Sequence, residues 1–83
     1  MDAKEFKQLK QTLRNTPYGK DYIETVKKHL LTAPKGQEID VNAYFDNDVL
    51  QRAKLTTAIH FLYSSSEIEI TINRNDNFKF TMI

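Results

Sequence analysis

The chain has 83 residues, which is enough for one small domain and too little for two. Twelve Lys and Arg residues against eleven Asp and Glu residues give a net charge of +1, and 40% of the residues are hydrophobic, which excludes a disordered polyelectrolyte. The absence of cysteine excludes disulfides, thiolate metal sites and cysteine nucleophiles. No apolar run approaches the roughly 20 residues of a membrane span, and residues 1–6 lack the apolar core of a signal peptide. We therefore expect a cytoplasmic domain with no membrane partner.

The segment from Asp2 to Asn15 has the periodicity of an amphipathic helix. Apolar side chains recur there at spacings of three and four residues, which places them in one stripe. The helix should end near Asn15, because Pro17 disfavours helical geometry at Thr16. The stripe consists of Phe6, Leu9 and Leu13.

A second helix is predicted after this break. Thr16 is a candidate N-cap with Pro17 in the first helical position, although Gly19 also fits a later start in which Asp21 is an acidic residue of the first turn. The tripeptide Pro34-Lys35-Gly36 is the strongest turn signal of the chain and ends the helix. From Tyr22 onward, its apolar face contains Ile23, Val26, Leu30 and Ala33.

The segment from Gln37 to Phe45 fits two structures. Its first half alternates apolar and acidic residues, as in a brief strand over Ile39 to Val41, whereas its second half fits a short helical turn. The cluster Asp46-Asn47-Asp48 contains helix N-cap residues, and residues 49–63 predict the third main helix. Apolar residues cover much of the circumference of that helix, so we expect it to be central and buried on more than one side.

The last stretch of the chain predicts a β-hairpin. Isoleucines at positions 68, 70 and 72 alternate with polar residues, and Phe78, Phe80 and Met82 do the same after a polar turn over residues 73–77. One face of the hairpin is therefore apolar and should cover the helices. Since an isolated two-stranded hairpin is marginally stable, we expect a third strand at Ile39 to Val41.

The resulting order of elements is helix, helix, short strand, helix and β-hairpin, which is an α+β arrangement. This order resembles a winged-helix domain preceded by one additional helix over residues 1–15. The same order also fits an α+β sandwich in which helices pack on a hairpin. In the winged-helix correspondence, residues 20–83 form the core, with Tyr22–Ala33 as the first core helix, Ile39–Val41 as the strand, Asn42–Asn47 as a shortened second helix, Asp48–Ser64 as the recognition helix and the C-terminal hairpin as the wing.

The winged-helix resemblance implies a DNA-binding accessory or regulatory protein. Arg52, Lys54 and Thr57 on the recognition helix are residue types that reach base edges or phosphates, and Arg74 at the hairpin tip has the chemistry to enter a minor groove. A homodimer would help, because one short recognition helix and one wing provide little phosphate contact. A basic flank of the first helix either anchors the DNA backbone or is a solvated surface, and it consists of Lys7, Lys10 and Arg14.

The alternative function is a regulator or inhibitor, of the kind that phages and mobile elements encode, that occupies the surface of a partner protein. Asp46 and Asp48 favour this alternative, because they would repel DNA from the start of the recognition helix. Tyrosine combines apolar area with a polar tip and is enriched at protein interfaces, and an acidic hairpin face suits a charged partner. The expected protein contacts are Tyr18, Tyr44, Glu67 and Glu69.

The sequence contains no recognisable catalytic or metal-binding constellation. His29 and His60 each lie in a predicted helix without a second histidine three or four residues away. The acidic cluster at residues 46–48 lacks the glycine and distal glutamate of a calcium loop, and Ser64-Ser65-Ser66 lacks a glycine elbow. We therefore expect no enzymatic activity, no metal site and no cofactor.

Overall fold

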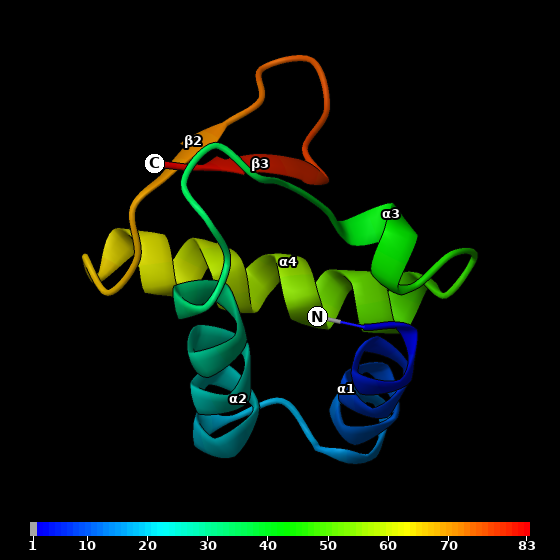
Figure 1. The fold of residues 1–83 in the computed structure, drawn as a ribbon. Helices are drawn as coiled ribbons and strands as arrows, with labels where there is room; N and C mark the ends of the chain where they lie inside the picture. The colour runs from blue at the N-terminus through cyan, green and yellow to red at the C-terminus, as the bar shows by residue number, and fades with distance from the viewer. Residues whose placement is uncertain (1) are drawn as a thin grey trace.

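The computed structural model describes residues 2–83, which form helices packed against a three-stranded antiparallel sheet (Figure 1). This confirms the α+β class and the order helix, helix, short strand, helix, hairpin. No helix of the described residues has the length and apolar character to cross a membrane. The elements in chain order are α1 (Ala3–Asn15), α2 (Lys20–Leu31), β1 (Glu38–Asp40), α3 (Val41–Tyr44), α4 (Val49–Ser64), β2 (Ile70–Ile72) and β3 (Lys79–Met82).

Aspartate side chains cap the first turns of three helices. The carboxylate of Asp2 accepts a hydrogen bond from the backbone N–H of Glu5 at 2.8 Å, and the carboxylate of Asp48 accepts one from Gln51 at 3.1 Å. Asp40 does the same for the short helix α3. Each cap satisfies a backbone donor that the helix leaves unpaired, so the prediction of an N-cap within residues 46–48 is confirmed.

The predicted start of α2 at Thr16 and Pro17 is wrong. Thr16 instead ends α1, because its hydroxyl donates to the carbonyl of Thr12 at 2.7 Å and its backbone N–H donates to the carbonyl of Leu13. The N-cap residue of α2 is Gly19, and Asp21 lies in the first turn, as the alternative start requires. Beyond the end of α2, Gly36 adopts a positive φ of 86°, which a glycine accommodates without strain.

The sheet has the strand order β1-β3-β2, with the last strand in the middle. Phe80 at its centre pairs with Ile39 on one side and with Ile72 on the other. The expected third strand and the apolar hairpin face are therefore confirmed. Ile68 lies before β2 rather than within it, but its side chain is buried all the same.

The boundary between β1 and α3 differs by one residue from the prediction. Val41, expected in the strand, is the first residue of α3, and α3 ends at Tyr44 rather than at Asn47. The Asp40 cap explains the early start, because its carboxylate holds the N–H of Asn42 at 3.0 Å. The N–H of Val41 still donates to the carbonyl of Phe78 at 2.8 Å, so the strand pairing runs into the first helical residue.

Helix α4 lies between the sheet on one side and α1 and α2 on the other (Figure 1). On the sheet side, the rings of His60 and Phe80 meet edge to face at 5.5 Å. On the helical side, the Nζ atom of Lys54 lies 4.9 Å from the ring centre of Tyr22. The prediction of a central helix buried on more than one side is therefore confirmed, and its fully buried apolar residues are Leu55, Ala58, Ile59 and Leu62.

Replacement of Ile70 by Asp should abolish cooperative folding. Ile70 is only 4% exposed on the apolar face of the sheet, so the variant loses the burial of a large side chain and must bury a carboxylate, at a total cost of at least about 4 kcal/mol. The matched control is Thr71→Asp, which changes the neighbouring exposed residue and should cost no more than about 1 kcal/mol. Thermal melts followed by circular dichroism measure both, and a native-like melt of Ile70→Asp would show that the strand register is wrong.

Candidate functional site

Arg52, a predicted DNA contact, connects α4 to α3 and to the hairpin. Its guanidinium donates to the side-chain carbonyl of Asn42 at 2.9 Å and lies 5.4 Å from the ring centre of Phe78. The side chain is half-buried, and its Nε atom is enclosed without a hydrogen-bond partner. Arg52 is therefore directed into the domain, where it joins three elements.

Lys54, the second predicted DNA contact on α4, completes the C-terminal end of α1. Its ammonium group donates to the backbone carbonyls of Leu13 at 3.3 Å and Thr16 at 2.8 Å. Carbonyls at the end of a helix have no partner within the helix, and the helix dipole favours a cation at that end. The ammonium also lies against the ring of Tyr22. This lysine therefore serves as a C-terminal cap supplied by another helix.

The remaining predicted DNA contacts are distributed over opposite sides of the molecule. Thr57 is exposed on α4, and Arg74 is exposed in the turn between β2 and β3. This turn lies on the sheet side of α4, whereas α1, which carries Lys7, Lys10 and Arg14, lies on the other side (Figure 1). The structure does not bring Arg74 and the basic flank of α1 together on one face.

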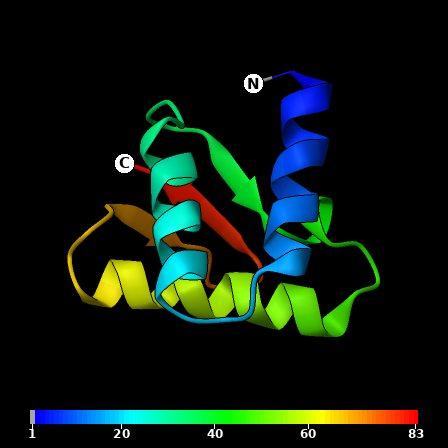
Figure 2. The same ribbon diagram turned by 90° about the horizontal axis from the view of Figure 1, so that it is seen from below.

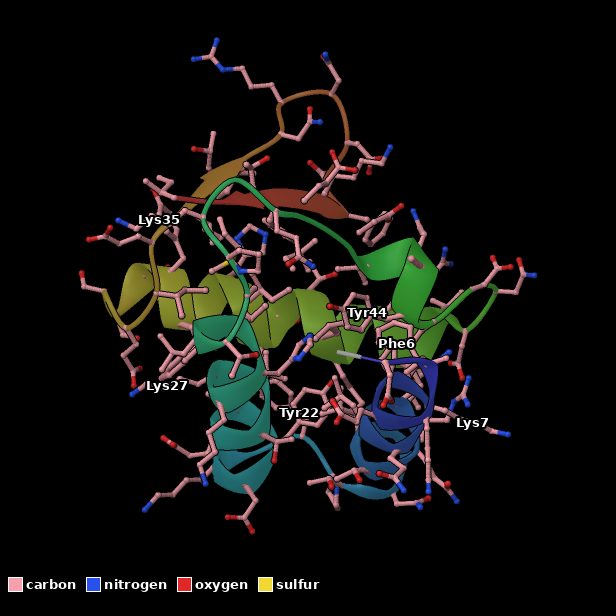
Figure 3. The ribbon with its side chains drawn as sticks, in the orientation of Figure 1. Phe6, Lys7, Tyr22, Lys27, Lys35 and Tyr44 are labelled. Atoms are coloured by element: carbon pink, nitrogen blue, oxygen red, sulfur yellow. The ribbon has the colours of Figure 1, made fainter. Side chains whose placement is uncertain are left out.

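The basic flank of α1 makes local contacts of its own. The Nζ atom of Lys10 lies 4.6 Å from the ring centre of Phe6, and the guanidinium of Arg14 lies 5.4 Å from that of Phe45. Lys7 extends away from the domain into solvent (Figure 3).

Tyr44, a predicted protein contact, is a core residue and is only 8% exposed. Its hydroxyl lies 2.8 Å from Nε2 of His29, and its ring meets the ring of Phe6 edge to face at 4.9 Å (Figure 3). Burial raises the pKa of Tyr44 to about 12. The helical turn of α3 directs this ring toward α1 and α2. The sequence pattern of one short helical turn does not indicate this direction. Tyr18, by contrast, is exposed and packs against Tyr22.

The two predicted acidic contacts precede strand β2 instead of lying on its outer face. Glu67 accepts hydrogen bonds from Ser65 Oγ at 2.6 Å and from Lys27 Nζ at 3.0 Å. The hydrogen bond from Ser65 and the Lys27 ammonium lower the pKa of the Glu67 carboxyl. Glu69 is exposed. Glu67 therefore connects Lys27 of α2 to Ser65 in the turn before the sheet. Its carboxylate is only partly available to a partner.

The structure contains an exposed apolar surface that the sequence analysis did not single out. We call it the α4 outer face and define it as Leu50, Ala53, Thr57 and Phe61, which follow one another at spacings of three, four and four residues and therefore share one side of the helix. All four are exposed, Leu50 to 67% and Phe61 to 50%, and Val49 at the edge of the face is 72% exposed.

No element of residues 2–83 covers the α4 outer face. Figure 2 shows α4 along the lower edge of the domain, with α1, α2 and the sheet all on its upper side. The face contains no charged side chain. The spacing of these four residues is visible in the sequence. Because α4 carries apolar residues all round, however, the sequence does not indicate which of its sides no other element covers.

A cavity of about 380 Å³ lies between the start of α1, the end of α2 and α3. Its walls include Phe6, Gln37 and the hydrogen-bonded pair of His29 and Tyr44. Burial lowers the pKa of the His29 imidazole, and its Nδ1 atom has no hydrogen-bond partner. Among residues 2–83, no group of three His, Cys, Asp or Glu side chains is placed to hold a metal ion.

No protein-family model, curated protein or solved structure matches the chain. The function must therefore be inferred from the surfaces of the domain itself. The α4 outer face differs in composition from a solvated protein surface, because it exposes Leu50 and Phe61 and carries no charge.

Replacement of Lys54 by Ala should destabilise the domain by about 1 to 2 kcal/mol, because two helix-terminal carbonyls lose a charged donor. Lys7→Ala removes an exposed lysine from α1 and should change the free energy of unfolding by less than about 0.5 kcal/mol. Urea titrations of the two variants measure the difference. Equal stability of both variants would show that Lys54 has no structural role.

The stability of the domain should fall as the pH drops below the ordinary histidine pKa of about 6.5. Burial lowers the pKa of His29 in the folded state, so the unfolded chain binds a proton more readily, and the contribution of the neutral imidazole is lost as the pH falls through its lowered value. His29→Gln should therefore show a smaller loss of melting temperature between about pH 7.5 and about pH 5 than the wild type. An unchanged loss of melting temperature in His29→Gln would contradict the assignment of the pH dependence to His29.

Proposed function

We propose that the chain is a protein-binding domain without enzymatic activity, which acts as a regulator or inhibitor by contacting a partner through the α4 outer face. The observation that carries the proposal is that Val49, Leu50 and Phe61 are each at least half exposed on an uncovered, uncharged side of the longest helix. A solvated helix side normally carries charged and polar residues. Contiguous exposed apolar groups of this kind are typical of protein interaction sites.

The energetic gain from covering this face is substantial for so small a domain. Full burial of a Leu or Phe side chain contributes about 1.5 to 3 kcal/mol. Leu50 and Phe61 lie at the two ends of the face, so a partner that covers both would bury the helix side between them as well.

The domain presents the face on a rigid helix. Lys54 joins α4 to the end of α1, Arg52 joins it to α3 and the hairpin, and Leu55, Ile59 and Leu62 are buried between the layers. A helix held on two sides loses little conformational freedom when the third side is covered, and such preorganisation favours binding.

DNA binding is the second candidate, and the retained order of elements favours it. In a winged-helix domain, α4 would be the recognition helix and the β2–β3 turn would be the wing. The α4 outer face, however, offers only Thr57 as a polar contact, since Arg52 and Lys54 are directed inward. Base recognition and counterion release both require polar or cationic side chains on the contacting surface.

Site-specific photo-crosslinking tests the proposal. The photoreactive residue p-benzoylphenylalanine is placed at Phe61, or at the exposed Gln8 on α1 as a matched control, in cells that express the chain. We expect a protein adduct from position 61 that is lost when Leu50→Asp is added, and no such adduct from position 8. No adduct at position 61, or equal adducts at both positions, would contradict the proposal.

A DNA titration distinguishes the second candidate. Fluorescence anisotropy with random-sequence duplex DNA should show no micromolar binding that weakens steeply with salt. Such binding, together with its loss in Arg74→Ala, would replace the protein-binding proposal with the winged-helix function.

A further inference from the structure

We infer that the partner that covers the α4 outer face is a second copy of this chain, with the two α4 helices antiparallel about a two-fold axis. This inference rests on the proposed protein-binding function and names its partner. It follows from the order of side-chain sizes along the face, from the absence of charge on it, and from the position of the acidic residues at its end.

The sizes of the side chains make the face complementary to itself. Large residues, Leu50 and Phe61, lie at its two ends, and small residues, Ala53 and Thr57, lie between them. In an antiparallel pair, Leu50 of one copy lies opposite Phe61 of the other at both ends, while Ala53 lies opposite Thr57 in the middle. Both pairings place the two-fold axis at the same point of α4 to within half a residue, or about 0.8 Å along the helix.

The small central residues permit the two helices to approach closely. Packed helices lie about 8 to 10 Å apart, and the distance depends on the side chains at the crossing point. With Ala53 and Thr57 at the crossing, the helices can reach the lower end of this range. The larger end residues then fill the space on either side of the crossing, which buries apolar area that is exposed in the single chain.

The charge distribution favours a second copy in the antiparallel orientation. A two-fold axis brings identical surfaces together, so a charged face would repel itself, but the α4 outer face carries no charge. Asp46 and Asp48 lie at the start of α4, and the antiparallel orientation places them beside Tyr63 and Ser64 of the other copy. A parallel pair would place the acidic ends of both copies together.

The expected complex is a weak dimer, because one helix side is a small interface. Sedimentation velocity of the full chain from about 1 µM to about 1 mM should show a monomer–dimer equilibrium with a dissociation constant in the micromolar range. Thr57→Lys should raise this constant at least about tenfold, since the axis brings two like charges together. The control is Thr12→Lys, which adds the same charge at an exposed threonine of α1 and should leave the constant unchanged.

A charge exchange tests the antiparallel register. Leu50→Lys and Phe61→Glu should each weaken the dimer as single variants, and the double variant should restore it, because each lysine then lies opposite a glutamate of the other copy. Both residues are at least half exposed, so the variants should fold, and thermal melts confirm this. Failure of the double variant to restore association would overturn the antiparallel pairing.

The outcome also separates this inference from the proposed function. A chain that remains monomeric at about 1 mM, but gives a photo-adduct at position 61 with a different protein, overturns the second copy as partner and keeps the protein-binding function. A monomeric chain without any adduct at position 61 overturns both. A dimer that is unaffected by Thr57→Lys overturns the α4 outer face as its interface.

Discussion

The structure depends on the burial of α4 between two layers. This helix packs against the three-stranded sheet and against α1 and α2, so it supplies core side chains to both, and apolar residues occupy most of its circumference. Its two cationic side chains lie at the borders between layers, where Arg52 reaches α3 and the hairpin and Lys54 reaches the end of α1. No other helix within residues 2–83 performs this role.

The packing of other elements on two sides of α4 also determines which side of this helix is exposed to solvent. Two sides of α4 are covered, and the third side, which carries Leu50, Ala53, Thr57 and Phe61, faces solvent in the single chain. The cations of the helix are engaged in internal contacts, so the exposed side offers shape and apolar area rather than charge. Shape and apolar area are properties through which proteins recognise other proteins, whereas binding to the phosphates of a nucleic acid requires cationic side chains. The order of elements alone, which resembles that of a winged-helix domain, does not distinguish these two uses of a central helix.

Much of the fold was predictable because its signals are local. The alternation of Ile70 and Ile72, the aspartate before α4 and the turn at Gly36 each act through neighbouring residues, and each was placed correctly. The errors occurred where one residue has two local partners. Thr16 has the chemistry of an N-cap for α2, yet its hydroxyl donates back to α1. The contact residues were harder to predict, since the burial of Tyr44 and the inward direction of Lys54 depend on elements distant in the chain.

Hydrophobic periodicity and turn residues were sufficient to predict the α+β class, the main helices, the hairpin and its apolar face, because these signals are local. Which side of α4 is exposed depends on long-range packing, because a helix with apolar residues all round has no preferred buried side until its neighbours are in place. The same packing gives the cations on α4 an internal role, because unpaired helix ends and aromatic rings from other elements lie within their reach. Long-range packing, rather than local pattern, therefore determines which side of α4 remains exposed to solvent.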